Sequence, residues 1–156
     1  MICNNVFEEW NEIDKNVFCF PLLTEHFCES LVIHYNNSME KEEKMIIEKE
    51  KNIIIDGITI VNFCMDNIWN NLLLNYIKPL ILKKLSYFVT KDVNTFVSRN
   101  IPFFHNHSSL FTVHIVLNKT KEEKLKTGYC YIYYSNDGNY QLNQKNDNII
   151  LTSYLE

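Results

Sequence analysis

The order of the hydrophobic patterns along the chain is the feature that most restricts its fold. Apolar residues recur at helical spacing in much of the first half, whereas beyond Asp92 they have the pattern of short strands. Helices followed by a run of strands are typical of an α+β domain, in which helices pack on one side of an antiparallel sheet or barrel. A jelly-roll barrel fits this order. With 156 residues and no internal repeat, we expect a single domain over residues 1–156.

Two segments carry the signals of helices. Thr24 can cap a helix that residues 36–38, two asparagines and a serine, should end. Asp66 can cap a second helix that runs to about Leu85, and Pro79 should kink or divide it.

The expected strands are short, and most of them follow the helices. The nearly all charged stretch 40–51 is instead predicted to be a solvated helix face or loop. Segment 53–61 is predicted to be a strand interrupted at Asp56 and Gly57. The aromatic residues of 129–134 are expected to form core and rim rather than a stacking surface. The remaining predicted strands are 17–20, 94–98, 110–117, 129–134 and 149–152.

Composition argues against several classes of function. A net charge of -4 provides no basic footprint, so nucleic-acid binding is not expected. No apolar stretch is long enough to span a membrane, and nothing near Met1 resembles a signal peptide, which predicts a soluble chain unless it is one piece of a longer protein. The five cysteines lack CxxC spacing, so no zinc site is expected. They are either buried free thiols or partners in one or two long-range disulfides.

His105 and His107 are the residues best suited to metal chemistry. They lie one residue apart just before a predicted strand, and side chains at i and i+2 of an extended segment point to the same side. Two imidazoles there could converge on one metal ion. A surface loop with two incidental histidines is the alternative, because a lone HxH motif is weak evidence.

Six segments resemble, in the same order, parts of the catalytic domain of the collagen lysyl hydroxylases. Segment 104–118 is similar to that family's H-x-D, S-T-F-T-I-N and L-N signature, and the residues that match it in register are Ser109, Phe111, Thr112, Leu117 and Asn118. The other similar segments are 16–25 (DVFWFPLFTE in the family), 28–32 (CDELVEE), 74–79 (LLEYIAP), 96–99 (FVVR) and 128–132 (GGCRF). The resemblance covers residues 16–156, with a poor match over 39–53.

This resemblance implies a double-stranded β-helix, which is a jelly-roll barrel, incomplete at the C-terminus and with an exposed edge there. Members of the family are 2-oxoglutarate and iron(II) dependent dioxygenases that hydroxylate peptidyl lysine in collagen. Two histidines and one carboxylate bind the iron and leave open positions for cosubstrate and oxygen. The resemblance therefore implies Fe(II), 2-oxoglutarate and ascorbate as cofactors and a collagen-like substrate. It implies the endoplasmic reticulum lumen as location if the chain is part of a longer protein.

The ligand set is incomplete when it is carried over residue by residue. His105 matches the first histidine, His107 stands in place of the carboxylate, and Leu155 stands in place of the distal histidine. The family's arginine for the far carboxylate of 2-oxoglutarate falls beyond the last residue of this sequence. Arg99 matches the arginine of the Arg-Tyr pair that enters the site, and is the one candidate for binding the cosubstrate. The sequence thus predicts a degenerate or truncated relative with no catalytic residues, inactive by itself.

Two alternatives stay open. A working oxygenase could use a variant site of His105, His107 and a third ligand such as Asp137 or Glu156. Alternatively, the barrel could serve as a non-catalytic interaction module, for example as the surface of a homodimer.

Overall fold

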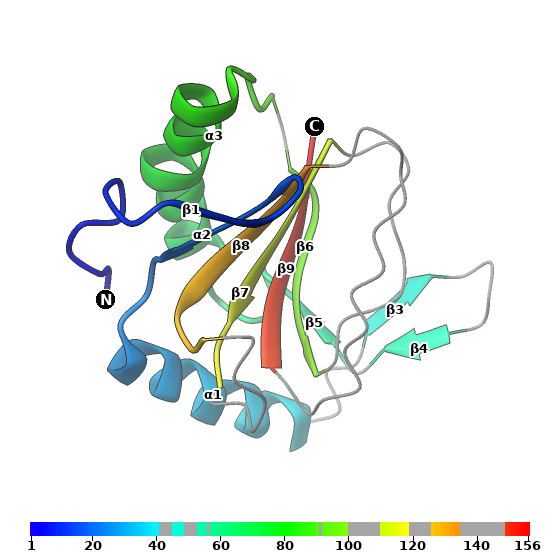
Figure 1. The fold of residues 1–156 in the computed structure, drawn as a ribbon. Coiled ribbons are helices and arrows are strands. Elements are labelled where there is room, and N and C mark those ends of the chain that lie inside the picture. Colours follow the sequence, from blue (N-terminus) through cyan, green and yellow to red (C-terminus); the bar gives the residue numbers. More distant parts are fainter. Residues whose placement is uncertain are drawn as a thin grey trace.

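The computed structural model describes residues 1–40, 45–48, 53–55, 57–90, 92–99, 110–118, 126–134 and 149–156. These residues form a mixed α+β fold with one seven-stranded antiparallel sheet and two helical segments (Figure 1). The predicted α+β class is therefore confirmed. The sheet is open, with β1 and β5 at its two edges.

The sheet has the strand order β1-β2-β8-β7-β9-β6-β5, and all neighbouring strands are antiparallel. Its strands are β1 (Asn11–Asp14), β2 (Val17–Pro21), β5 (Gly57–Thr59), β6 (Asp92–Arg99), β7 (Phe111–Val116), β8 (Tyr129–Tyr134) and β9 (Ile149–Leu155). The predicted strands at 17–20, 94–98, 110–117, 129–134 and 149–152 are confirmed, and β9 is longer than expected. Because β9 pairs with both β6 and β7, the prediction that the last strand would leave an exposed edge is wrong.

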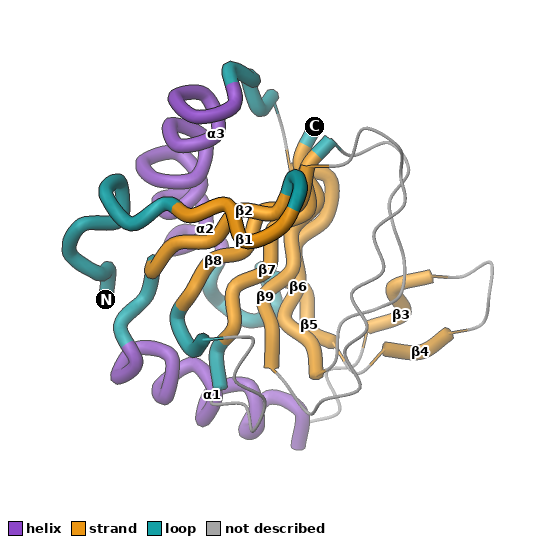
Figure 2. Tube along the Cα trace, in the orientation of Figure 1, coloured by secondary structure: helices purple, strands orange, loops and turns teal. Residues whose placement is uncertain are grey.

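A separate hairpin pairs β3 (Met45–Glu48) with β4 (Ile53–Ile55), and β3 contacts β5 (Figure 2). The prediction of a helix face or loop for the charged stretch is wrong for residues 45–48. Met45, Ile46 and Ile47 interrupt the charges, and Met45 pairs with Ile55 across the hairpin. A local pattern of charge cannot reveal a pairing partner further along the chain.

The first helix, α1 (Glu25–Glu40), begins directly after Thr24, as predicted. The backbone N–H of Cys28 donates to the carbonyl of Thr24, which is the first hydrogen bond of the helix. The predicted end at residues 36–38 is wrong, because the helix continues to Glu40. Tyr35 and Ser38 are both buried, and this packing outweighs the low helix propensity of the asparagines between them.

The second helical segment is divided where Pro79 predicts a break. It consists of α2 (Asp66–Leu72), a π-helical turn η1 (Leu73–Ile77) and α3 (Lys78–Leu85). Pro79 cannot donate a backbone hydrogen bond, and the wider turn lies directly before it. Asp66 is the first helical residue, with Met65 at the N-cap, so the prediction that Asp66 caps the helix is wrong by one position.

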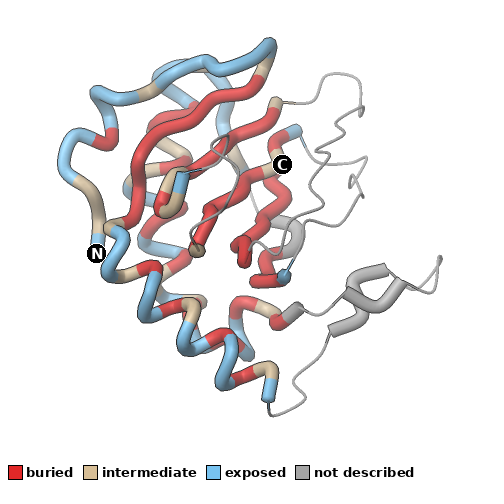
Figure 3. Tube along the Cα trace, turned by 60° about the horizontal axis from the view of Figure 1, so that its bottom comes forward, coloured by how far each residue is buried: buried red, intermediate tan, exposed pale blue. Residues whose placement is uncertain are grey.

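Both helical segments share one hydrophobic core with a single face of the sheet. In each strand, every second residue contributes to this core, because successive side chains of a strand point to opposite faces of the sheet. Figure 3 shows these strands buried along the described residues. The core includes Phe20, Val97, Phe111, Val113, Ile115, Cys130, Ile132, Leu151 and Leu155 of the sheet with Leu31, Tyr35, Trp69, Leu72, Ile77, Leu80 and Ile81 of the helices.

We call the opposite side of the sheet the second face. It consists of Val17 and Cys19 of β2, Tyr129, Tyr131 and Tyr133 of β8, Thr112, His114 and Val116 of β7, Ile150, Thr152 and Tyr154 of β9, and Phe96 and Ser98 of β6. Most of these side chains are buried, although the helices pack on the other side. The second face is therefore an interior surface.

The sequence left open whether the cysteines are free thiols or form disulfides. All five are free thiols in the structure. Cys19, Cys28 and Cys130 are buried, whereas Cys64 is exposed. In the described part of the chain, no helix combines the length and the apolar character needed to cross a bilayer.

Candidate functional site

The two histidines that the sequence analysis singled out, His105 and His107, lie outside the described residues, as does Asp137. Their convergence on a metal ion stays a prediction. Leu155 and Arg99, the other two positions carried over from the family, are described, and each has a defined environment.

Leu155 belongs to the hydrophobic core between the sheet and the helices. It is fully buried and pairs with Phe111 of β7 and Asp92 of β6. Its alkyl side chain has no donor atom for a metal. Position 155 therefore contributes packing to the helix side of the sheet.

Arg99 lies at the end of β6 and contacts α1. Its backbone N–H donates to the hydroxyl of Tyr35 at 3.1 Å, and Nη2 of its guanidinium donates to Oδ1 of Asn36 at 3.4 Å. Alternation along β6 puts Arg99 on the same side as Val97, which is in the helix-side core. Arg99 is thus turned toward the helix and away from the second face.

The middle of the second face is a row of side chains that runs straight across five strands. Register pairs Phe96 with Thr152, Thr152 with His114, His114 with Tyr131, and Tyr131 with Cys19. All five are buried. Directly opposed side chains on one face of a sheet are in contact distance, so an imidazole and two hydroxyls are gathered inside the protein.

His114 is the chemically most distinctive member of this row. Its side chain is 3% exposed, and Nδ1 lies 3.0 Å from Oγ1 of Thr152. The ring of Tyr133 meets it edge-on, with 5.3 Å between ring centroids. Burial lowers the pKa of His114 from 6.5 to about 3, so the imidazole is neutral at neutral pH.

The other titratable groups of the second face also favour their neutral forms. Burial raises the pKa of the Tyr131 hydroxyl, which accepts a hydrogen bond of 2.9 Å from the backbone N–H of Lys126. Burial likewise raises the pKa of the Cys19 thiol. Among its described side chains, the second face contains no Asp, Glu, Lys or Arg. A cation lies beside this face, however: Nζ of Lys126 is 5.2 Å from the ring centroid of Tyr129, and its charge opposes the rise in the pKa of the Cys19 thiol.

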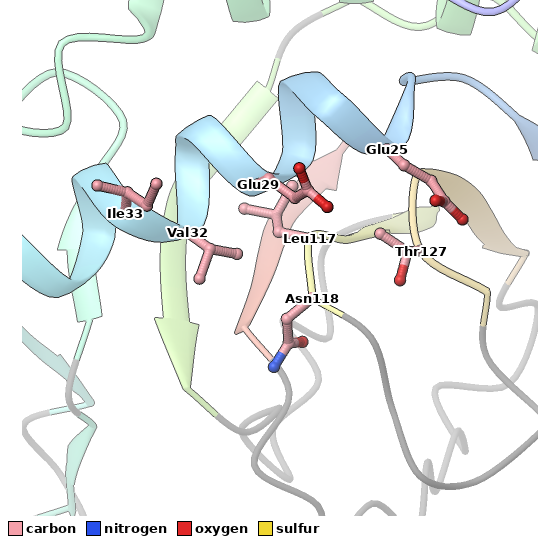
Figure 4. Close-up of a pocket in the computed structure, with 7 residues that line it drawn as sticks. All are labelled: Glu25, Glu29, Val32, Ile33, Leu117, Asn118 and Thr127. Atoms are coloured by element: carbon pink, nitrogen blue, oxygen red, sulfur yellow. The ribbon is translucent and has the colours of Figure 1, made fainter.

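A groove of about 430 Å³ lies on the helix side, between α1 and the chain at the end of β7 (Figure 4). Leu117 is buried in it, whereas Glu25 and Glu29, one helical turn apart, are exposed. Oδ1 of Asn118 accepts a hydrogen bond from the backbone N–H of Ile149 at 2.9 Å, which joins the end of β7 to the start of β9. The remaining residues that line the groove are Val32, Ile33 and Thr127.

The described residues do not fit the iron centre that the resemblance implies. Position 155 supplies no ligand atom, Arg99 contacts α1, and no group of three His, Cys, Asp or Glu side chains in the described ranges could hold a metal ion. His114 was not assigned a role from the sequence. The signal was present, since His114 interrupts an apolar strand between Val113 and Ile115 and alternation turns it away from both.

Comparison with known proteins adds no assignment: no protein-family model matches the chain, and no curated protein matches it.

Proposed function

We propose that this chain is a jelly-roll domain related to the collagen lysyl hydroxylases, and that it binds a ligand or partner without hydroxylating lysine. The observation that carries the proposal is the strand order β8-β7-β9-β6, in which the last of four successive strands lies between the first two. One sheet of a jelly roll has this order, because its eighth strand returns between its first and third strands.

The burial of the second face supports the same fold. A jelly roll encloses its interior between two sheets, and its helices lie outside. Here the helical segments pack on one side of the sheet, whereas polar side chains such as His114, Thr152 and Ser98 are buried on the other. A buried polar face is what the interior of a ligand-binding barrel presents.

Three features favour a non-catalytic role. An imidazole at His107 replaces the negative carboxylate that balances Fe(II) in the family, and Leu155 packs in the core. Arg99, the one candidate for binding the cosubstrate, contacts Asn36 of α1 instead. Losing one group that merely supports a metal ligand commonly costs ~10–100-fold in affinity or activity, and the loss of two ligands costs more.

Anaerobic titration with Fe(II) and 2-oxoglutarate tests this proposal. We expect neither stoichiometric iron binding nor turnover of 2-oxoglutarate when oxygen is admitted. Tight binding of one iron per chain together with turnover would refute the non-catalytic role. In that event the His105→Ala variant shows whether His105 is a ligand, because its loss would then abolish iron uptake.

A further inference from the structure

The groove between α1 and the end of β7 is lined by apolar side chains that remain accessible (Figure 4). Leu117 is buried in it, whereas Ile33 is 62% exposed, so the groove opens to solvent. Its volume of about 430 Å³ falls in the range of roughly 300–1,000 Å³ that is usual for binding pockets. The groove is therefore large enough and open enough to receive a ligand.

The carboxylates of the groove come from the same face of α1 as its apolar residues. Glu25, Glu29 and Val32 are four and three positions apart, so they form a row along the helix. Glu25 lies in the first turn, where the helix dipole favours a carboxylate. Glu29 lies one turn further on, and the effect of the dipole falls off within the first turn. The position of Glu29 thus has no explanation in the stability of the helix itself.

Glu29 is exposed, and in the described part of the chain it forms no ion pair. Two described cations from neighbouring elements have other contacts. Nη2 of Arg99 donates to Asn36, beyond the groove, and Nζ of Lys126 lies over the ring of Tyr129 on the second face. The end of the groove at Glu29 is therefore acidic, and a basic group is its electrostatic complement.

We propose that this groove docks an extended peptide segment of a partner protein, in which an arginine or lysine stands two residues from a leucine, isoleucine or valine. Side chains at i and i+2 of an extended peptide share one side and are about 6.6 Å apart. Glu29 and Ile33 are separated by a rise of about 6 Å along α1. The apolar side chain can thus lie on Val32 and Ile33 while the basic group reaches Glu29.

This inference goes beyond the proposed function, because the groove lies on the helix side and does not involve the second face. It also does not depend on the relation to the lysyl hydroxylases. Its test contains neither iron nor 2-oxoglutarate, so its failure would leave the test of the proposed function unaffected.

Three tripeptides with blocked ends, Leu-Gly-Arg, Leu-Gly-Glu and Gly-Gly-Arg, separate the effect of charge from that of the apolar side chain. At low ionic strength, we expect Leu-Gly-Arg to shift the ¹⁵N NMR signals of Val32, Ile33 and Leu117 saturably. The dissociation constant should be on the order of millimolar for so small a ligand. The other two peptides should each bind roughly tenfold more weakly, because one reverses the charge and the other removes the apolar contact.

Substitutions at exposed positions test the same two contacts without disturbing the core. Glu29→Lys should reverse the preference, so that Leu-Gly-Glu binds more tightly than Leu-Gly-Arg. Glu40→Lys, which makes the same change of charge beyond the groove on the same helix, should leave the preference unchanged. Ile33→Ser should weaken the binding of Leu-Gly-Arg, whereas Ile13→Ser, at the comparably exposed position of β1, should not.

Equal binding of Leu-Gly-Arg and either of the other peptides would overturn the proposal, as would an unchanged preference in Glu29→Lys or the absence of a saturable shift. A second copy of the chain is the competing occupant of the groove. Sedimentation of the protein alone should show a monomer, and a dimer that Ile33→Ser dissociates would also overturn the proposal.

Discussion

Gly128 packs directly against the backbone of Leu23, at the point where β2 leads into α1. A Cβ atom at position 128 would lie 2.1 Å from the carbonyl oxygen of Leu23, and the carbonyl of Gly128 accepts hydrogen bonds from the backbone N–H groups of Leu22 and Leu23 at 3.0 and 2.9 Å. Gly128 also has a φ of +82°. The turn before β8 and the start of α1 are thus joined by a contact that only glycine permits.

Gly128→Ala should therefore destabilise the fold. The left-handed backbone alone costs roughly 1–2 kcal/mol for a residue with a Cβ, and the clash with backbone atoms adds to it. The free energy of unfolding, measured in urea, should fall by more than this amount. Thr127→Ala, at the neighbouring and partly exposed position, is the control and should change it little. Equal stability of the two variants would contradict the contact.

Substitutions at Leu155 distinguish a packing residue from a metal-ligand position. Leu155→Ala should lower the free energy of unfolding by about 2–5 kcal/mol, as large-to-small changes in a core do. Leu155→His, which places the family's residue at the aligned position, should also destabilise the chain and should not create iron binding. Leu110→Ala, at a position that is 38% exposed, should have a much smaller effect. Iron uptake by Leu155→His, measured by anaerobic titration, would contradict this interpretation.

The buried imidazole of His114 should make stability depend on pH. Its pKa is about 3 in the folded chain and 6.5 when exposed, so the unfolded state binds more protons between these values. Stability should therefore fall as pH decreases from about 6.5 toward 3, by at most roughly 5 kcal/mol over the whole window at ~1.4 kcal/mol per pKa unit. Cys19 and Tyr131, on the same face, have raised pKa values and do not titrate in this range.

Carboxylates also titrate in this window, so the informative quantity is the difference between the native chain and His114→Phe. Urea unfolding at a series of pH values should show a weaker acid dependence in the variant. Parallel pH profiles would show that His114 is accessible to protons in the folded chain.

Thr152→Val should cost about 1–3 kcal/mol, because it leaves Nδ1 of His114 buried without its hydrogen bond. Valine has almost the same shape as threonine, so packing is nearly unchanged. Thr112→Val, on the same face but only partly buried, is the matched control and should be close to neutral. Thermal unfolding of both variants measures the difference, and equal melting temperatures would contradict a contribution from the Thr152 hydroxyl.

The local elements were predictable from the sequence because their signals are local. The alternation of apolar residues predicts β7 almost to the residue, and the run of β-prone aromatic residues predicts β8. Pro79 predicts the break that the π-helical turn makes. The end of α1 was missed because the burial of Tyr35 and Ser38 depends on the rest of the fold.

The sequence by itself determined the α+β class, the positions of most strands and the side of its strand to which each residue points. Only the tertiary structure decided that β9 lies between β6 and β7, that Leu155 faces the helices, that Arg99 contacts α1 and that His114 meets Thr152 inside the protein. The physical reason is that periodicity is a property of neighbouring residues, whereas strand order and burial depend on which distant segments pair.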